Sequence, residues 1–294
     1  MRTRIKYSQN FLKDPGLVNN LLSKSSIDLD DRVLEIGAGN GIITRELLKR
    51  AKKVTAYEVD SNLYKELRER FQKARSKLEI IECNFLDTRL PNVPYKVFSN
   101  IPFNITADVI KKLVLGNNPP QDIYLITQKE AAAKFLGKPL SDKNSLMSVV
   151  IGNLFEGSVF HEFKKTDFSP VPSVDTVLLR LERLKRPHAQ PQGLFNDFVA
   201  FGFSQFEPNM QKGLGKAMDE RLIDQTAKEN NFNPSLKPSR LDLNHWLALF
   251  DKFLTSGNQK DVVGSYNKLL TQQSKLQKIR RTRADKNWRK FARY

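Results

Sequence analysis

The stretch from Val97 to Asn104 holds the residue types best suited to chemistry in this chain. Asn100 ends an apolar run typical of a buried strand, so its amide lies where a strand opens into a loop. Pro102 fixes its own φ and keeps Ile101 extended, which leaves carbonyl groups available to a ligand. Phe103 adds a flat, rigid ring. An acceptor amide, carbonyl oxygens and an aromatic plane suit a planar amine such as a nucleobase, although a proline turn with a core aromatic would explain the same residues.

A glycine-rich turn is the second candidate. Gly37, Gly39 and Gly41 follow a short apolar strand and precede an amphipathic helix over 42–51. Glycines let a backbone approach a ligand closely. A nicotinamide-binding fingerprint needs a third glycine where Ile42 stands. Glu35, just before the turn, is a poor neighbour for a pyrophosphate and suits a ligand with a cationic end.

Polar residues also end the next strands of the predicted sheet. Strand 54–60 ends in Glu58 and Asp60, about 20 residues past the glycines, where a carboxylate can meet ribose hydroxyls. Strand 78–83 ends at Asn84 and Phe85, and strands 95–99 and 122–127 follow. Strands that alternate with helices predict a parallel sheet, whose ligands lie at the carboxyl ends of the strands.

Two later segments are open to two interpretations each. The strands 157–163 and 175–184 are expected to pair as a hairpin, and the prolines between them make a rigid span that projects Phe168. That ring could stack on the second face of a base, or it could belong to the core. Lys134, Lys138 and Lys143 lie in or near a loop and could contact phosphates, or they could simply be solvated.

Composition indicates a polyanionic partner. The 294 residues carry a net charge of +17, which favours nucleic acid over a membrane. Residues 275–294 hold nine basic residues and one acid, with three aromatics between them, as in a segment that folds onto RNA. A solvated tail is the alternative. Before it, helices over 195–206, 214–230 and 243–254 predict a small helical domain after a linker at 185–193.

The same composition excludes several classes of protein. A single cysteine, Cys83, allows neither an internal disulfide nor a cysteine-built zinc site and fits a reducing cytoplasm. The three histidines follow no metal-ligand spacing, so we expect no metal. The chain has no long apolar run, so we expect neither a signal peptide nor a membrane span. No Ser-His-Asp arrangement and no P-loop lysine is present.

Together these motifs resemble the S-adenosylmethionine-dependent rRNA adenine dimethyltransferases, which comprise the Erm macrolide-resistance enzymes and relatives of the KsgA type. The resemblance rests on five motifs in order, from Tyr7 to the helical domain: Ser8-Gln9-Asn10-Phe11-Leu12, Glu35 to Gly41, Glu58-Val59-Asp60, Asn100-Ile101-Pro102-Phe103 and Phe168 to Val174. It implies a class I methyltransferase fold, an α/β Rossmann-like doubly wound sheet, with a second, small all-α domain and a basic C-terminal tail.

The resemblance also implies a role for each residue. Asn100, Ile101, Pro102, Phe103 and Phe168 would hold and stack the target base. Asn84 stands where the family usually has an aspartate that accepts from the donor's adenine amine, and a neutral asparagine puts donor affinity in question. Residues that would bind the methyl donor are Gln9, Asn10, Leu12, Glu35, Gly37, Gly39, Glu58, Asn84, Phe85 and Asn100. RNA contacts would come from Lys134, Lys138, Lys143, Arg280, Arg281, Arg283, Arg289 and Lys290.

The expected substrate is 23S rRNA. Glu207-Pro208-Asn209 and the basic tail resemble Erm enzymes, which implies adenine methylation in free or precursor 23S rRNA and resistance to macrolides, lincosamides and streptogramin B. A housekeeping 16S rRNA dimethyltransferase and a non-catalytic nucleic-acid-binding relative are the alternatives. We expect a cytoplasmic monomer with a catalytic domain at 1–184, a helical RNA-binding domain at 185–256 and a tail at 257–294. The sequence leaves open whether the tail is ordered.

Overall fold

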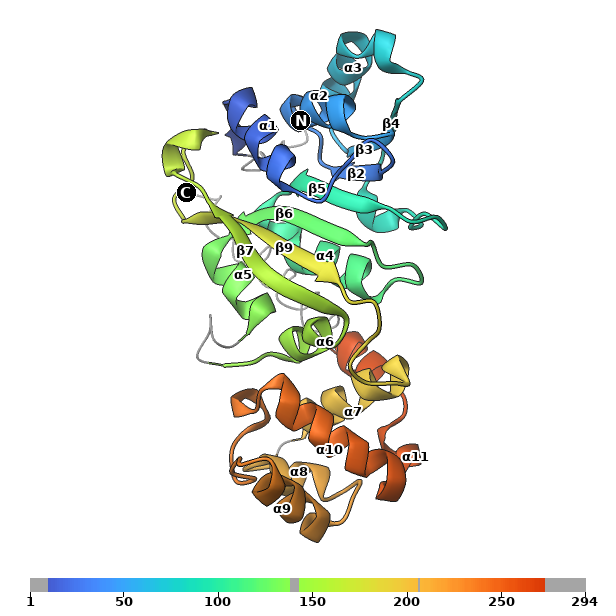
Figure 1. Cartoon of the computed structure of the whole chain (residues 1–294), viewed down its shortest axis with the longest axis vertical. Helices are drawn as coiled ribbons and strands as arrows, with labels where there is room; N and C mark the ends of the chain where they lie inside the picture. The colour runs from blue at the N-terminus through green and yellow to red at the C-terminus, as the bar shows by residue number, and fades with distance from the viewer. Residues whose placement is uncertain (1–9, 138–142, 206, 273–294) are drawn as a thin grey trace, which may run out of the picture. The chain divides into compact units, whose positions relative to one another are not determined.

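The computed structural model describes residues 10–137, 143–205 and 207–272 (Figure 1). These residues form two compact units. The first lies within Met1–Leu136 and Leu154–Lys185, and the second within Gly137–Asn153 and Arg186–Tyr294. The second unit therefore includes the segment before Leu154, which the sequence placed in a catalytic domain of residues 1–184. Among the described residues, no helix is both long enough and apolar enough to span a membrane.

A seven-stranded mixed sheet forms the centre of the first unit. Its strand order is β4-β3-β2-β5-β6-β9-β7, and the last two strands run antiparallel to their neighbours. This doubly wound α/β arrangement confirms the predicted fold class, including the late hairpin. The strands are β2 (Arg32–Ile36), β3 (Lys53–Glu58), β4 (Leu78–Glu82), β5 (Lys96–Asn100), β6 (Asp122–Gln128), β7 (Phe155–Glu162) and β9 (Thr176–Arg183).

Helices cover both faces of this sheet. Apolar side chains of α1 and α2 join one buried cluster with Val33, Val54 and Phe98, so these two helices pack on the same face. Helices α4 and α5 lie behind the sheet in Figure 1. Each helix buries one apolar stripe, as the 3.6-residue period requires. The helices of this unit are α1 (Pro15–Lys24), α2 (Ile42–Arg50), α3 (Ser61–Arg70), α4 (Thr106–Leu115) and α5 (Lys129–Leu136).

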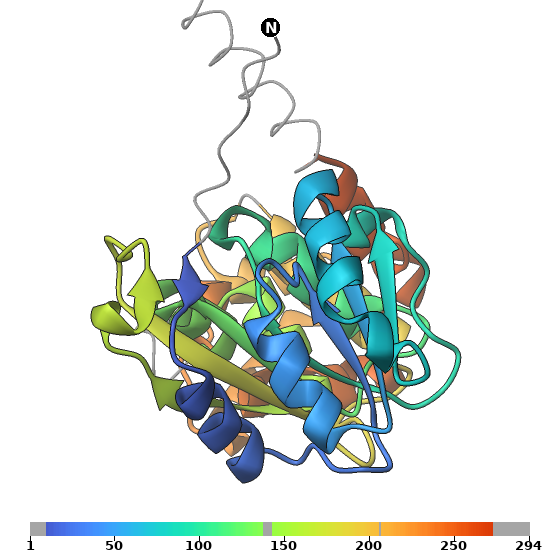
Figure 2. The ribbon, with the colours of Figure 1, turned by 90° about the horizontal axis from the view of Figure 1, so that it is seen from above.

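Two short strands join segments that are far apart in the sequence. Strand β1 (Phe11–Leu12) pairs antiparallel with β8 (Phe168–Ser169), and Leu12 lies opposite Phe168. Figure 2 shows the blue N-terminal strand beside the yellow-green one. The N-cap Asp14 accepts a hydrogen bond from Gly16 N at 2.7 Å, which starts α1 immediately after β1, as the sequence indicates. This pairing places residues 10–12 next to the sheet.

The second unit is helical around an aromatic core that includes Trp246. The helix predicted over 214–230 is present but begins later, because the chain turns after Leu214 and restarts at Asp219, whose carboxylate caps the new helix. Val262 and Tyr266 are buried, so the packed unit extends past residue 257, where the tail was predicted to begin. Its helices are α6 (Leu146–Leu154), α7 (Gln192–Ser204), α8 (Met210–Leu214), α9 (Glu220–Glu229), α10 (Leu243–Ser256) and α11 (Gln259–Val262).

Candidate active site

The strands β2 and β5 part at their carboxyl ends. Their ladder ends at the pair Leu34 and Val97, whereas β2 stays paired with β3 as far as Ile36. Beyond the ladder, the Ser99 hydroxyl accepts a hydrogen bond from Ile36 N at 2.8 Å and takes the place of a backbone partner. The strand order also reverses between β2 and β5, and ligands of open α/β sheets bind at such a point.

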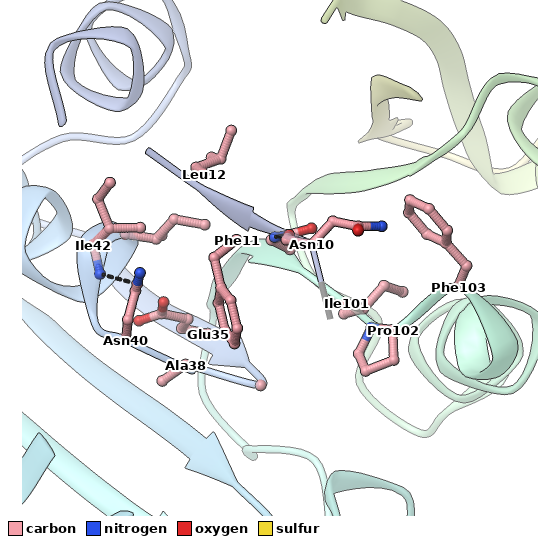
Figure 3. A pocket seen from close by; sticks show the side chains of 13 residues that line it. Asn10, Phe11, Leu12, Glu35, Ala38, Asn40, Ile42, Ile101, Pro102 and Phe103 are labelled. Atoms are coloured by element: carbon pink, nitrogen blue, oxygen red, sulfur yellow. Dashed lines mark hydrogen bonds between the residues drawn. The ribbon is translucent and has the colours of Figure 1, made fainter. Parts of the chain in front are cut away.

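A pocket opens where these strands part. It encloses about 470 Å³ of space outside the protein atoms, part of which is open solvent. Figure 3 shows it between the segment around Phe11, the glycine turn and the proline turn. Its walls come from three parts of the chain and consist of Asn10, Phe11, Leu12, Glu35, Gly37, Ala38, Asn40, Ile42, Ile43, Asn100, Ile101, Pro102 and Phe103.

The glycine turn forms one wall of the pocket, and its backbone takes left-handed conformations that favour glycine. Gly37 has φ +72°, and the N–H groups of Gly37 and Ala38 both donate to the Tyr57 carbonyl, at 2.8 and 3.1 Å. Gly39 has φ +56°, and a Cβ there would lie 2.5 Å from the Phe11 ring. A side chain at either glycine would be strained, and at Gly39 it would also displace the aromatic ring.

Asn100 has a fixed orientation. Its Nδ2 donates to the Asn10 carbonyl at 2.7 Å, which assigns the amide nitrogen to that side and leaves Oδ1 as an acceptor. Within the described ranges, no protein donor contacts Oδ1, and no backbone N–H donates to the Ile101 carbonyl. Pro102, with φ −57°, starts the short 3₁₀ turn Phe103–Ile105. The site therefore presents acceptors and a half-buried phenylalanine, as the sequence indicates.

Glu35 is a buried acid in the pocket wall. Its side chain is 1% exposed and accepts a hydrogen bond from Thr44 Oγ1 at 2.5 Å. Burial raises the pKa of Glu35 to about 8, although the hydrogen bonds from Thr44 oppose that rise. Glu35 is therefore mostly protonated at neutral pH, and a cationic group beside it would favour the ionised form. Its chemistry fits the predicted ligand with a positive end.

Glu58 lies beside the pocket but does not line it. Its side chain is 1% exposed, and its carboxylate accepts hydrogen bonds from Gly39 N at 2.8 Å and from Val59 N and Asp60 N at 2.9 Å each. The carboxylate thus ties the glycine turn to the end of β3. Two oxygens with several lone pairs still have capacity for ribose hydroxyls.

Asn84 and Phe85 also lie outside the pocket wall. Asn84 is exposed, and its Oδ1 caps the 3₁₀ turn Phe85–Asp87 by accepting from Leu86 N at 3.1 Å. Phe85 is 3% exposed, and its ring meets the Tyr57 ring edge to face, with 5.2 Å between centroids. Both residues follow β4, two strands from the parting of the sheet.

Phe168 requires a correction. Its side chain is 1% exposed and packs against Phe163, with 5.3 Å between ring centroids. Pairing of β8 with β1 turns the ring into the core beside Leu12, so it cannot stack on a base in this structure. The aromatic residues that line the pocket are Phe103 and Phe11.

The basic candidates are only partly described. Lys134 forms an ion pair with Glu130 at 2.7 Å, and Lys143 is exposed in the second unit. The structure does not bring these two lysines into the pocket. Outside the described residues lie Gln9, Lys138, Arg280, Arg281, Arg283, Arg289 and Lys290. Among the residues described, no cluster of histidine, cysteine and acidic side chains could hold a metal ion.

Sequence reasoning missed five pocket residues: Phe11, Ala38, Asn40, Ile42 and Ile43. Phe11, the residue between Asn10 and Leu12, lies inside a motif already singled out. Asn40 lies within the glycine turn, and its Oδ1 accepts from Ile42 N at 3.1 Å. Phe11, Ala38 and Asn40 lie inside the motifs quoted above, and Ile42 and Ile43 directly follow the glycine motif, so position in the chain was the signal that could have found them.

Comparison with known proteins points to one family. The family model described as "Ribosomal RNA adenine dimethylase" matches residues 1–252. The ribosomal RNA small subunit methyltransferase A of Synechococcus sp. (strain JA-2-3B'a(2-13)) is 30% identical over 88% of this chain and 96% of its own length. An rRNA methyltransferase of Streptomyces thermotolerans is 32% identical over 85% and 83% of the two chains.

Solved structures agree in fold. The 23S rRNA methyltransferase ErmE has a TM-score of 0.74 and 27% identity, over 83% of this chain and 99% of its own. A dimethyladenosine transferase from Plasmodium falciparum has a TM-score of 0.68 and 22% identity, over 84% and 99% of the two chains. The chain therefore belongs to the ribosomal RNA adenine dimethylase family and is an S-adenosylmethionine-dependent rRNA adenine N6-methyltransferase.

Proposed function

We propose that this enzyme methylates the exocyclic amine of an adenine in 23S rRNA, once or twice, and thereby confers resistance to macrolides, lincosamides and streptogramin B. The observation that carries the proposal is the oriented amide of Asn100, a residue that lines the pocket at the parting of β2 and β5 and keeps Oδ1 as an acceptor. The likeness to the 23S rRNA methyltransferase ErmE favours this RNA. The enzyme would act in the cytoplasm as a monomer, on free or precursor RNA before ribosome assembly.

S-adenosylmethionine fits the pocket residues. A Cβ at Gly37 would lie at ordinary van der Waals distance from its neighbours, 3.8 Å from the Pro102 ring and 4.0 Å from the Asn100 carbonyl, so the glycine leaves that space to a ligand. Glu35 would lie on the cationic side of the donor, and Asn10 and Leu12 would cover it. Glu58, Asn84 and Phe85, at the ends of the next two strands, would bind its ribose and adenine. The bound donor supplies an electrophilic methyl group.

The residues of the proline turn would prepare the nucleophile. An adenine amine is a poor nucleophile because its lone pair is delocalised into the ring. Asn100 Oδ1 and the Ile101 carbonyl can accept the two amine hydrogens and favour a pyramidal nitrogen. Positioning then supplies much of the rate acceleration, with no strong general base. The adenine must leave its helical stack, which costs a few kcal/mol, and stacking on Phe103 offsets part of that cost.

Phe103 should therefore matter through its ring. Replacing Phe103 by alanine is expected to lower kcat/KM for an RNA hairpin by about 5- to 150-fold, the equivalent of about 1–3 kcal/mol of stacking. Phe103→Tyr keeps an aromatic plane and should stay within about threefold of wild type. Steady-state methyl transfer with labelled donor measures both. Equal losses of kcat/KM in the two variants would show that Phe103 does not contribute by stacking its ring on the base.

A second candidate is methylation of 16S rRNA. The small subunit methyltransferase of Synechococcus, and further relatives with the same name, favour it. The methyl-transfer chemistry would be the same, because the acceptor amine belongs to an adenine in both RNAs. Only the RNA that delivers the base would differ.

Two measurements separate these candidates. Expression in a susceptible bacterium should raise the erythromycin concentration needed to stop growth, and the Asn100→Ala variant, expressed equally, should not. Labelled methyl transfer should favour protein-free 23S over 16S rRNA, and mapping should place the label on an adenine N6. Transfer to 16S rRNA alone, with unchanged erythromycin sensitivity, would contradict the 23S proposal and support the second candidate.

A further inference from the structure

Lys112 connects helix α4 to the loop that follows β4. Its Nζ donates to the backbone carbonyls of Phe85 at 2.5 Å and Leu86 at 2.9 Å, and also to the carbonyl of Thr88. The same ammonium lies 4.7 Å from the centroid of the Phe85 ring. Because an ammonium has three N–H donors, these three carbonyls occupy all of them.

This arrangement is unusual for a lysine because the charge meets main-chain dipoles and a ring instead of an acid in direct contact. The residue is partly buried, and desolvation lowers the pKa of Lys112, while Asp87 and Cys83 oppose that shift. Three convergent carbonyls and an aromatic face compensate the lost hydration. The contacts fix the backbone of residues 85–88 against α4.

That loop carries two residues of the proposed donor site. Asn84 caps the loop through Leu86 N, and the Phe85 ring packs on Tyr57, whose carbonyl accepts from the glycine turn. Helix α4 itself begins at Thr106, just after the Asn100 turn. Lys112 therefore joins the loop proposed for the donor's adenine to the helix that follows the methyl-transfer site.

We infer that Lys112 is a positioning residue for the donor's adenine, because its ammonium holds the loop Asn84–Thr88 in the conformation that exposes Asn84 and packs the Phe85 ring against Tyr57. This inference rests on the proposed placement of the donor. It assigns no contact between Lys112 and the donor. It does imply that Lys112 contributes to donor binding and very little to RNA binding or to the methyl-transfer step.

The test replaces Lys112 by methionine, which keeps the apolar stem and removes the ammonium. S-adenosylhomocysteine should bind the folded variant about tenfold or more weakly by calorimetry without RNA, because several charge-assisted hydrogen bonds are lost. KM for the donor should rise likewise, with kcat and KM for RNA within about twofold. Lys111→Met, one position earlier on α4, removes the same charge without these contacts and should bind as wild type does.

Two further measurements separate positioning from general stability. 5′-Methylthioadenosine, which has the adenine but no amino-acid end, should lose the same factor as S-adenosylhomocysteine. In a double-mutant cycle, Lys112→Met should add little to the loss caused by Asn84→Ala, since both act through one loop.

If Lys112→Met does not fold, Lys112→Arg takes its place. A planar guanidinium cannot donate from one nitrogen to three carbonyls, so a loss in the same direction is expected. Donor affinity within twofold of wild type in the folded variant, or fully additive losses in the cycle, would overturn the inference. Absence of RNA methylation by the wild-type enzyme would instead contradict the proposed function.

Discussion

Replacing Asn100 by alanine is expected to lower single-turnover methylation of an RNA hairpin by about 100- to 1,000-fold, the loss typical when one oriented hydrogen-bonding group of an active site is removed. We assign two functions to this amide. Its Nδ2 holds the Asn10 carbonyl at 2.7 Å, and its Oδ1 accepts a hydrogen of the target amine. Alanine removes both. Folding should survive, since Asn100 is half-buried and lies at the end of β5.

A matched control is available at the other end of α4. Asn117 is exposed in the turn after that helix, so Asn117→Ala makes the same chemical change away from the pocket. It should methylate at the wild-type rate. The thermal midpoint of both variants, measured with and without S-adenosylhomocysteine, would show that each is folded and still binds the donor. A folded Asn100→Ala enzyme with a near-normal single-turnover rate would exclude Asn100 as the residue that holds the amine.

Glu35→Gln should make the protein more stable at alkaline pH. Burial raises the pKa of Glu35 from 4.5 to about 8 in the folded state. Between those two values the folded chain binds more protons at this site than the unfolded chain, so stability falls as the pH rises. Each pKa unit corresponds to about 1.4 kcal/mol, so the contribution amounts to several kcal/mol above pH 8. A neutral glutamine avoids that loss.

Unfolding in urea between pH 4 and pH 9 measures this effect. Wild type and Glu35→Gln should differ least near pH 4, and the variant should become the more stable of the two as the pH approaches 9. Glu66→Gln, on the exposed surface of α3, should follow the wild-type profile. Parallel profiles for Glu35→Gln and wild type would contradict the raised pKa.

The carboxyl group of Glu35 lowers the free energy of unfolding as the pH rises, so we expect it to serve a function. The positive end of the methyl donor would favour the ionised form of Glu35, so donor binding would recover part of the cost. Glu35→Gln should then bind S-adenosylhomocysteine more weakly than wild type while being more stable without it. Such an exchange of stability for function is common at active sites.

Local motifs were enough to predict most of the pocket. The glycine turn is visible because its three glycines end a strand and precede a helix, and the structure places Gly37 and Gly39 at positive φ. The Asn100 turn is visible because Pro102 stiffens it. Since the carboxyl ends of parallel strands share one edge of a sheet, these two motifs were expected to meet, and they do.

The features that could not be predicted depend on contacts between distant segments. Phe168 enters the core only because β8 pairs with β1, and no local pattern near Phe168 encodes that partner. Glu58 turns its carboxylate to three backbone N–H groups, one of them in the glycine turn. Lys112 has its three carbonyl partners between 24 and 27 residues earlier in the chain.

A crystal structure with S-adenosylhomocysteine and an adenosine-containing RNA fragment would show whether the donor and the target adenine meet in this pocket. We expect the homocysteine part to lie against Gly37 and Glu35, with the sulfur facing Asn100, and the exocyclic amine of one adenine to donate to Asn100 Oδ1 and to the Ile101 carbonyl. A donor bound at another edge of the sheet, or an adenine whose amine is held by other residues, would contradict this placement.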